Sequence, residues 1–243
     1  MWGWIGGSAL LIGATIGYWI ALPQRLIAGV MAIGSGVLIS AVAFDLMDEA
    51  YKRGGFDSTA LGFLGGAIAY TLANVWLSRS GAKHRKRSGH NPDRSQHPAS
   101  ANSGIAIAIG ALLDGIPESV ALGVALLDRK GIGFLMLAAV FLSNLPESLS
   151  SIDDLRKEGF SGRRITLSWS IVGVCVAAAV VLSFLFLHHL DPNALGIIES
   201  FASGAILAML ADGMMPEAYE NGGFLTAFMT MSGFLTAFIL SKI

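Results

Sequence analysis

The sequence predicts an all-α polytopic membrane protein with eight transmembrane helices, built as an inverted repeat of spans 1–3 and 6–8 around spans 4–5. Three observations lead to this fold class. The 243-residue chain is 53% hydrophobic and 14% charged, whereas soluble domains carry about 25% charged residues. Apolar runs of the roughly 20 residues that a helix needs to cross a bilayer recur along the chain. A segment from the first quarter of the chain also returns near its end.

The apolar runs are continuous, which argues against strands, because half-buried strands alternate between apolar and polar residues. The runs lie near residues 2–22, 25–49, 59–78, 103–127, 131–152, 165–188, 194–217 and 222–241. The polar segment between the third and fourth runs is rich in Ser, Asn, Pro and basic residues, so we expect a mobile loop over residues 80–102. We expect residues 1–243 to form a single transmembrane domain.

Charge predicts the orientation. Eleven of the 16 Lys and Arg residues fall in the loops after the first, third, fifth and seventh spans. Cytoplasmic loops carry an excess of these residues. The 80–102 loop is therefore predicted to be cytoplasmic and both termini to lie outside, in a cell membrane (inner or plasma).

The internal repeat links the second and seventh spans. EAYKRGGF at residues 49–56 returns as EAYENGGF at residues 217–224, and ten of 23 positions are identical between 34–56 and 202–224. Five crossings separate the copies, so they are predicted to point in opposite directions, as in transporters whose substrate site lies between two inverted halves. The alternative is a shared packing motif without internal symmetry.

The fourth and fifth spans each contain Pro-Glu-Ser, in LLDGIPESVALG and FLSNLPESLSS. A polar residue stands four positions before each acid, Asp114 before Glu118 and Ser143 before Glu147, so each pair shares a helix face. Asn144 adds an amide oxygen. The prolines cannot donate to the carbonyls four residues back, and backbone freed in this way must face protein or a water-filled cavity. These faces are therefore predicted to look toward each other.

Acids inside a bilayer are costly, and several carboxylates close together repel unless they are protonated or bridged by a cation. A bridging divalent metal ion is the favoured explanation, and protonated acids bonded across helices are the alternative. The predicted metal ligands are Asp114, Glu118, Ser143, Asn144 and Glu147.

Other acids are candidates for the ion pathway. Asp45 lies near the outer end of the second span, Asp212 in the seventh span, and Asp153 where the fifth span ends. Acids at a membrane edge are also commonly only hydrated by the adjoining water. For all three residues, this is the alternative to a role in the ion pathway.

The motifs DGIPES and SNLPES resemble those of the ZIP (Zrt/Irt-like) family of divalent metal transporters, and the likeness covers nearly the whole chain. The resemblance implies eight spans, the inverted repeat, and binding of the transported ion by the motif residues. The family's motif histidines are replaced here by Asp114 and Ser143. An all-oxygen shell suits harder ions than imidazole does, so zinc, manganese and ferrous iron all remain candidates.

The predicted function is thus a transporter that moves a divalent metal cation toward the cytoplasm. It is not expected to be an enzyme or to need a cofactor. Its partners would be the metal ion and the lipid bilayer, with no nucleic acid, and a homodimer is permitted. The alternatives are an intramembrane acid–base enzyme, since paired acids can exchange protons with a substrate, and a non-transporting metal sensor of the same fold.

Overall fold

A computed structural model of the protein describes residues 2–79, 101–127, 132–157 and 160–242. Every regular element in these ranges is helical, which confirms the all-α class. The elements are α1 (Trp2–Trp19), α2 (Gln24–Ala41), the π-helical turn η1 (Val42–Leu46), α3 (Met47–Leu77), α4 (Ala101–Ala125), α5 (Ile132–Lys157), α6 (Gly162–Leu187), α7 (Pro192–Met209), the π-helical turn η4 (Leu210–Met214), α8 (Met215–Gly222) and α9 (Leu225–Leu240).

The predicted loop lies outside the described residues except at its end, because α4 already begins at Ala101. The three histidines of that segment, His84, His90 and His97, also lie outside the described residues.

Five helical stretches of the described chain are long and apolar enough to cross a membrane. They are Gln24–Leu77, Ala108–Ala125, Gly133–Ile152, Gly162–Leu187 and Pro192–Gly222. Large apolar side chains such as Trp19, Leu61, Phe186 and Phe224 are mostly exposed, and soluble monomers rarely carry extensive apolar surface. Together these features describe a multi-pass membrane protein. The count of eight spans stays a prediction.

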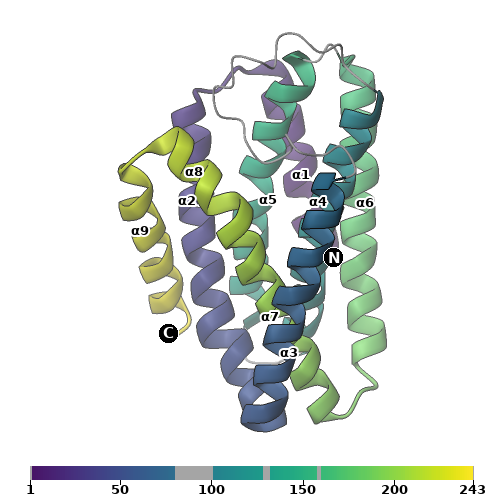
Figure 1. Ribbon diagram of the computed structural model, residues 1–243, viewed down its shortest axis with the longest axis vertical. Helices are drawn as coiled ribbons and strands as arrows, with labels where there is room; N and C mark the ends of the chain where they lie inside the picture. The colour runs from purple at the N-terminus through teal and green to yellow at the C-terminus, as the bar shows by residue number, and fades with distance from the viewer. Residues whose placement is uncertain (1, 80–100, 128–131, 158–159, 243) are drawn as a thin grey trace.

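The stretch Gln24–Leu77 is divided at Gly55, whose φ of 70° and ψ of −177° lie outside the helical region. A positive φ is readily adopted only by glycine. In Figure 1, α2 runs downward and the later part of α3 returns upward, so the chain reverses near this residue. The 54-residue stretch therefore consists of two antiparallel rods.

The two copies of the repeated segment have the same local backbone conformation. The π-helical turns η1 and η4 begin 168 residues apart, at Val42 and Leu210. The two positive-φ glycines, Gly55 and Gly223, have the same spacing. Figure 1 shows α2 running downward and α7 upward. The repeated letters thus specify the same sequence of helix, π-helical turn and glycine break in both places.

The two copies also pack in a related way, with α2 against α9 and α7 against α3. A Cβ added to Gly36 would lie 1.9 Å from the Thr230 carbonyl oxygen in α9, and one added to Gly204 would lie 1.9 Å from the Phe63 oxygen in α3. Small residues at such crossings let apolar helices approach closely in a membrane. These glycines hold the outer helices against the bundle.

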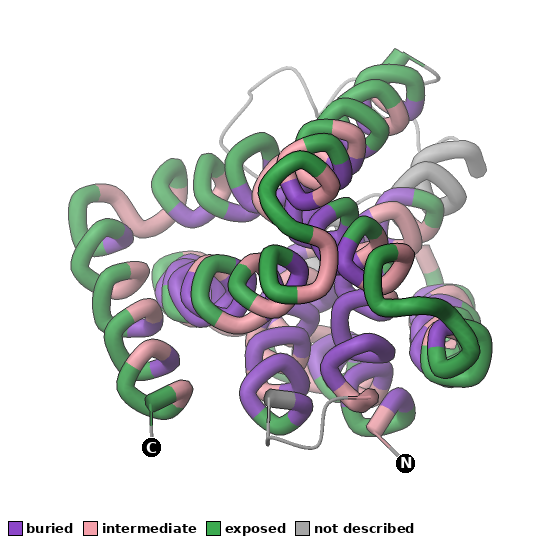
Figure 2. Tube along the Cα trace, turned by 90° about the horizontal axis from the view of Figure 1, so that it is seen from below, coloured by how far each residue is buried: buried purple, intermediate pink, exposed green. Residues whose placement is uncertain are grey.

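Helices α4 and α5 occupy the middle of the bundle (Figure 1). Both contribute to two buried apolar clusters, one shared with α2 and α7 and the other with α1 and α6. In Figure 2, buried residues gather toward the centre and exposed ones lie on the outward faces. The two helices with the duplicated acidic motif therefore bury much of their surface against the other helices.

We expect Gly204→Ala to destabilise the protein by about 1–3 kcal/mol, the usual range for overpacking, because its methyl group would collide with the Phe63 carbonyl oxygen. Thermal unfolding of purified protein in detergent measures this. The matched control is Gly65→Ala on the same α3–α7 side, where a Cβ would meet the Phe201 ring at 3.7 Å, an ordinary contact. Equal unfolding midpoints for the two variants would contradict the predicted packing.

Candidate functional site

The candidate site is built on a hydrogen bond between α4 and α5. The Ser143 hydroxyl donates to Glu118 Oε1 at 2.8 Å, and the same Oγ lies 2.9 Å from the Val140 carbonyl oxygen of its own helix. Glu118 is 2% exposed, and Ser143 and Asn144 are each 1% exposed. The structure therefore brings together one predicted ligand from each of the two Pro-Glu-Ser helices.

Two polar atoms of these residues are buried without a hydrogen-bond partner among the described residues, Glu118 Oε2 and Asn144 Nδ2. Leaving such an atom unsatisfied costs about 1–3 kcal/mol. In native proteins, buried groups of this kind are usually explained by strain, by a functional role, or by a water molecule or ion. The α4–α5 contact thus carries unused capacity to bind a polar or charged species.

Helix α5 is pressed against α2 at the same level. A Cβ on Gly34 would lie 2.7 Å from the Leu142 carbonyl oxygen and 3.3 Å from the Ser143 nitrogen. The Leu142 carbonyl oxygen is the acceptor to which Pro146 cannot donate a backbone hydrogen bond. Gly34 therefore lets α2 approach the backbone beside Ser143, and this contact fixes the height of Ser143 in the bundle.

The serines of the two Pro-Glu-Ser motifs bond to backbone carbonyls. Ser119 Oγ donates to the Gly115 oxygen at 2.6 Å, and Ser148 Oγ lies 3.0 Å from the Leu145 oxygen. Both serines are fully buried. Their hydroxyls therefore bond within their own helices, whereas Glu118 bonds across to α5.

Asp114 is 8% exposed, and its Oδ1 accepts a hydrogen bond from the Tyr70 hydroxyl of α3. Glu147 is half-buried on α5. Across the part of the chain that the structure describes, no three His, Cys, Asp or Glu side chains converge as a set that could hold a metal ion. The structure thus joins Glu118 to Ser143 but does not gather the three predicted acids into one cluster.

The candidate pathway acids have different surroundings. Asp45 is half-buried in η1, and its Oδ2 has no hydrogen-bond partner among the described residues. Asp212 is exposed in η4 and accepts a hydrogen bond from the Asn74 side chain. The backbone of Asp153 belongs to α5, but its side chain is outside the described part of the structure.

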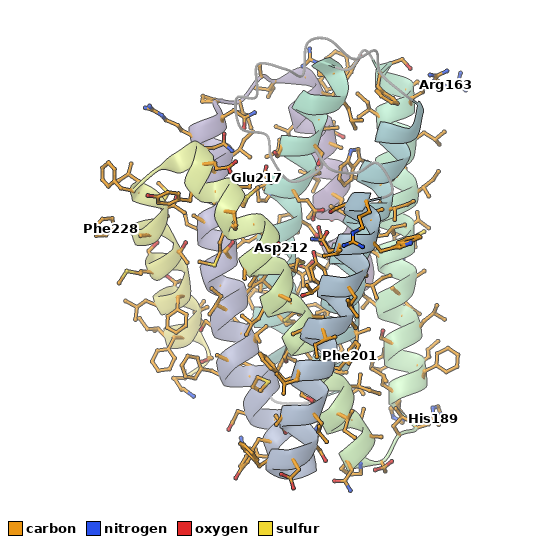
Figure 3. All side chains as sticks on the ribbon, in the orientation of Figure 1. Arg163, His189, Phe201, Asp212, Glu217 and Phe228 are labelled. Atoms are coloured by element: carbon orange, nitrogen blue, oxygen red, sulfur yellow. The ribbon has the colours of Figure 1, made fainter. Side chains whose placement is uncertain are left out.

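Sequence reasoning missed the donors that α3 supplies. Tyr70 and Asn74 stand four residues apart and are buried, and each bonds to an acid on another helix. Their signal in the sequence was available, because polar residues at i and i+4 in an apolar span share one face. A further pair, the Ser150 hydroxyl and the Glu217 carboxylate, joins α5 to α8; Figure 3 shows Glu217 and Asp212 at different heights along the α7–α8 rod.

A cavity of about 270 Å³ lies away from these residues and is lined by Arg53, Leu127, His188, Pro192 and Leu195. The Arg53 guanidinium lies 3.1 Å from Glu49 and 3.4 Å from Glu199. Two carboxylates neutralise this cation, so the wall of the cavity does not present a free positive charge to an anion.

Comparison with known proteins gives one informative similarity. No protein-family profile matches this chain. An Arabidopsis thaliana protein named "Putative zinc transporter" is 24% identical over 217 residues, which are 88% of this chain and 33% of that protein. This chain therefore spans about a third of the length of its relative.

We expect opposite effects on stability from removing the two partners of the α4–α5 hydrogen bond. Glu118→Met removes a buried acid and should raise the free energy of unfolding by about 1–3 kcal/mol, the range attached to burying a polar group. Ser143→Ala leaves Glu118 Oε1 without its donor and should lower the free energy of unfolding by a similar amount. Thermal unfolding in detergent with a metal chelator measures both.

The control for that pair is Glu220→Met, since Glu220 is exposed on α8 and surface changes usually stay within about 0.5 kcal/mol. If Glu118→Met lowered stability as strongly as Ser143→Ala, Glu118 would be a structural residue.

Proposed function

We propose that this protein carries a divalent metal cation across the membrane and that the cation binds at the contact between α4 and α5. The observation that carries the proposal is Glu118, a carboxylate 2% exposed in an apolar bundle and held by Ser143 from the neighbouring helix. An ionised buried carboxylate needs a compensating charge. A cation entering from water supplies that charge, and Glu118 Oε2, a buried acceptor without a hydrogen-bond partner among the described residues, supports a positively charged guest.

In this proposal the ligands are Glu118, Ser143 and Asn144, joined by Asp114 and Glu147 when the cargo is bound. Each offers an oxygen atom, from a carboxylate, a hydroxyl or a side-chain amide. Since the acids are not gathered into one cluster in this structure, their approach to the ion would be part of the transport cycle.

The relative from Arabidopsis supports metal as the cargo, since that protein is named as a zinc transporter and the similarity covers 88% of this chain. The motif resemblance to the ZIP family points the same way. Oxygen donors alone suit harder ions than imidazole-containing sites do. We therefore propose a divalent transition metal, with zinc, manganese and ferrous iron as the candidates.

We also propose the finer architecture of eight spans with an inverted repeat. Its support is the shared backbone of the two copies, with π-helical turns and positive-φ glycines at the same spacing. The charge distribution supports termini outside and movement of metal toward the cytoplasm. Asp45 and Asp212 would then lie on the two approaches to the central site.

An intramembrane acid–base enzyme is the second candidate function. It would use a carboxyl group to exchange protons with a bound substrate. Glu118 is enclosed and bonded to a serine of a near-duplicate helix, an arrangement that favours cation coordination over access by a lipid or peptide. A non-transporting sensor would bind the same ion without moving it across the membrane. A measurement of metal flux therefore distinguishes a sensor from a transporter.

Glu118→Gln and Glu147→Gln are expected to lower metal uptake into proteoliposomes by at least about 100-fold, because each removes a charge that offsets the cation in a site of low polarity. Radioactive zinc and manganese provide the measurement. Asp57→Asn serves as the control, since Asp57 is an exposed acid on α3 and should transport normally. Uptake by both glutamine variants at the wild-type rate would eliminate the proposed site.

Restoring imidazole should change which metal is preferred. In Asp114→His/Ser143→His, nitrogen ligands stand at the positions where the motifs depart from the ZIP pattern, and nitrogen favours zinc over manganese. We expect the ratio of zinc to manganese uptake to rise by about tenfold, which corresponds to about 1.4 kcal/mol. Competition between the two metals in the same vesicles measures it, and an unchanged ratio would mean that these positions do not contact the cargo.

A further inference from the structure

Tyr70, from a third helix, forms a hydrogen bond with one of the predicted ligands. It lies on α3, 44 positions before Asp114, is 3% exposed, and donates its hydroxyl hydrogen to Asp114 Oδ1. Tyrosine carries its polar group at the end of a large apolar ring, so a buried tyrosine hydroxyl needs a partner. Here that partner is an acid on the same helix face as Glu118.

The face of α3 that carries Tyr70 is polar and buried, unlike the opposite face. One turn later, Asn74 is 9% exposed and donates to Asp212 in η4. The opposite side of the same helix exposes Leu61, Leu64, Ile68 and Leu72. An apolar helix therefore places two donors at i and i+4 against two acids from two different elements, which packing alone does not require.

We propose that Tyr70 is a positioning residue for the cargo, acting through Asp114. The phenol fixes the orientation of the Asp114 carboxylate relative to Glu118, which stands one turn further along α4. Hydrogen bonds from outside the ligand set orient metal-binding carboxylates, and their loss typically lowers metal affinity or activity about 10- to 100-fold. This inference rests on the proposed function, because it takes Asp114 as a ligand of the transported ion.

A purely structural hydrogen bond would behave differently. Its removal would lower stability and the amount of folded protein, but each folded molecule would bind metal as before. A positioning role instead changes the apparent affinity for metal, and it does so only while Asp114 keeps its carboxylate. The two roles are therefore separated by the KM for metal and by a double-mutant cycle, which isolates the coupling between two residues.

The experiment uses the full chain in proteoliposomes and measures initial rates of manganese and zinc uptake over a range of metal concentrations. Tyr70→Phe removes only the hydroxyl. We expect KM to rise about tenfold, with the maximal rate per folded transporter kept within about twofold. In the Asp114→Asn background, adding Tyr70→Phe should change KM by less than about twofold, since the carboxylate that the phenol orients is already gone.

Tyr51→Phe is the control, because it removes the same hydroxyl group from a tyrosine that is 55% exposed and lies before the Gly55 break; its KM should equal that of the wild type. An unchanged KM in Tyr70→Phe would overturn the positioning role, and so would equal effects of Tyr70→Phe on KM with and without the Asp114 carboxylate. In either case, metal uptake by the wild type would leave the proposed function standing. If wild-type vesicles take up no more metal than empty ones, the proposed function fails, and the role of Tyr70 fails with it.

Discussion

Burial of the Glu118 carboxyl group is the constraint on which the rest of this structure depends. A carboxylate in an apolar bundle is costly unless donors or a counter-charge reach it, and the Ser143 hydroxyl of α5 is the donor present. That bond requires α4 and α5 to stay close and at a fixed height. The close approach of Gly34 to the α5 backbone beside Ser143 serves the same requirement from α2.

Hydrogen bonds between side chains join several of the helices. Ser143 meets Glu118, Tyr70 meets Asp114, Asn74 meets Asp212, and Ser150 meets Glu217. Each pair consists of one neutral donor and one acid from different elements. Hydrogen bonds to charged groups contribute more than neutral ones, so these pairs fix the acids in place without neutralising them. Under the proposed function, a cation would meet acids that are oriented and still negatively charged.

The repeated segment contributes a shape that recurs at both ends of the bundle. Each copy carries a π-helical turn followed by a glycine with positive φ, and π-helical turns are frequent at functional sites. Each turn contains an aspartate, Asp45 in one and Asp212 in the other, and each copy packs against a partner helix through a close glycine contact. The two copies thus share one backbone pattern, and the helices that precede the two turns, α2 and α7, both pack in the apolar cluster that includes α4 and α5.

The sequence by itself determined the all-α membrane class, most helix positions and the motif that supplies Glu118 and Ser143, because apolar length, proline and i,i+4 spacing act locally. It also predicted one cluster of acids, whereas the described residues hold Glu118 against Ser143 and Asp114 against Tyr70. Only the tertiary structure decided which donor meets which acid. Those pairings depend on how helices distant in sequence are rotated and shifted against one another, and close packing of side chains over the whole bundle sets both.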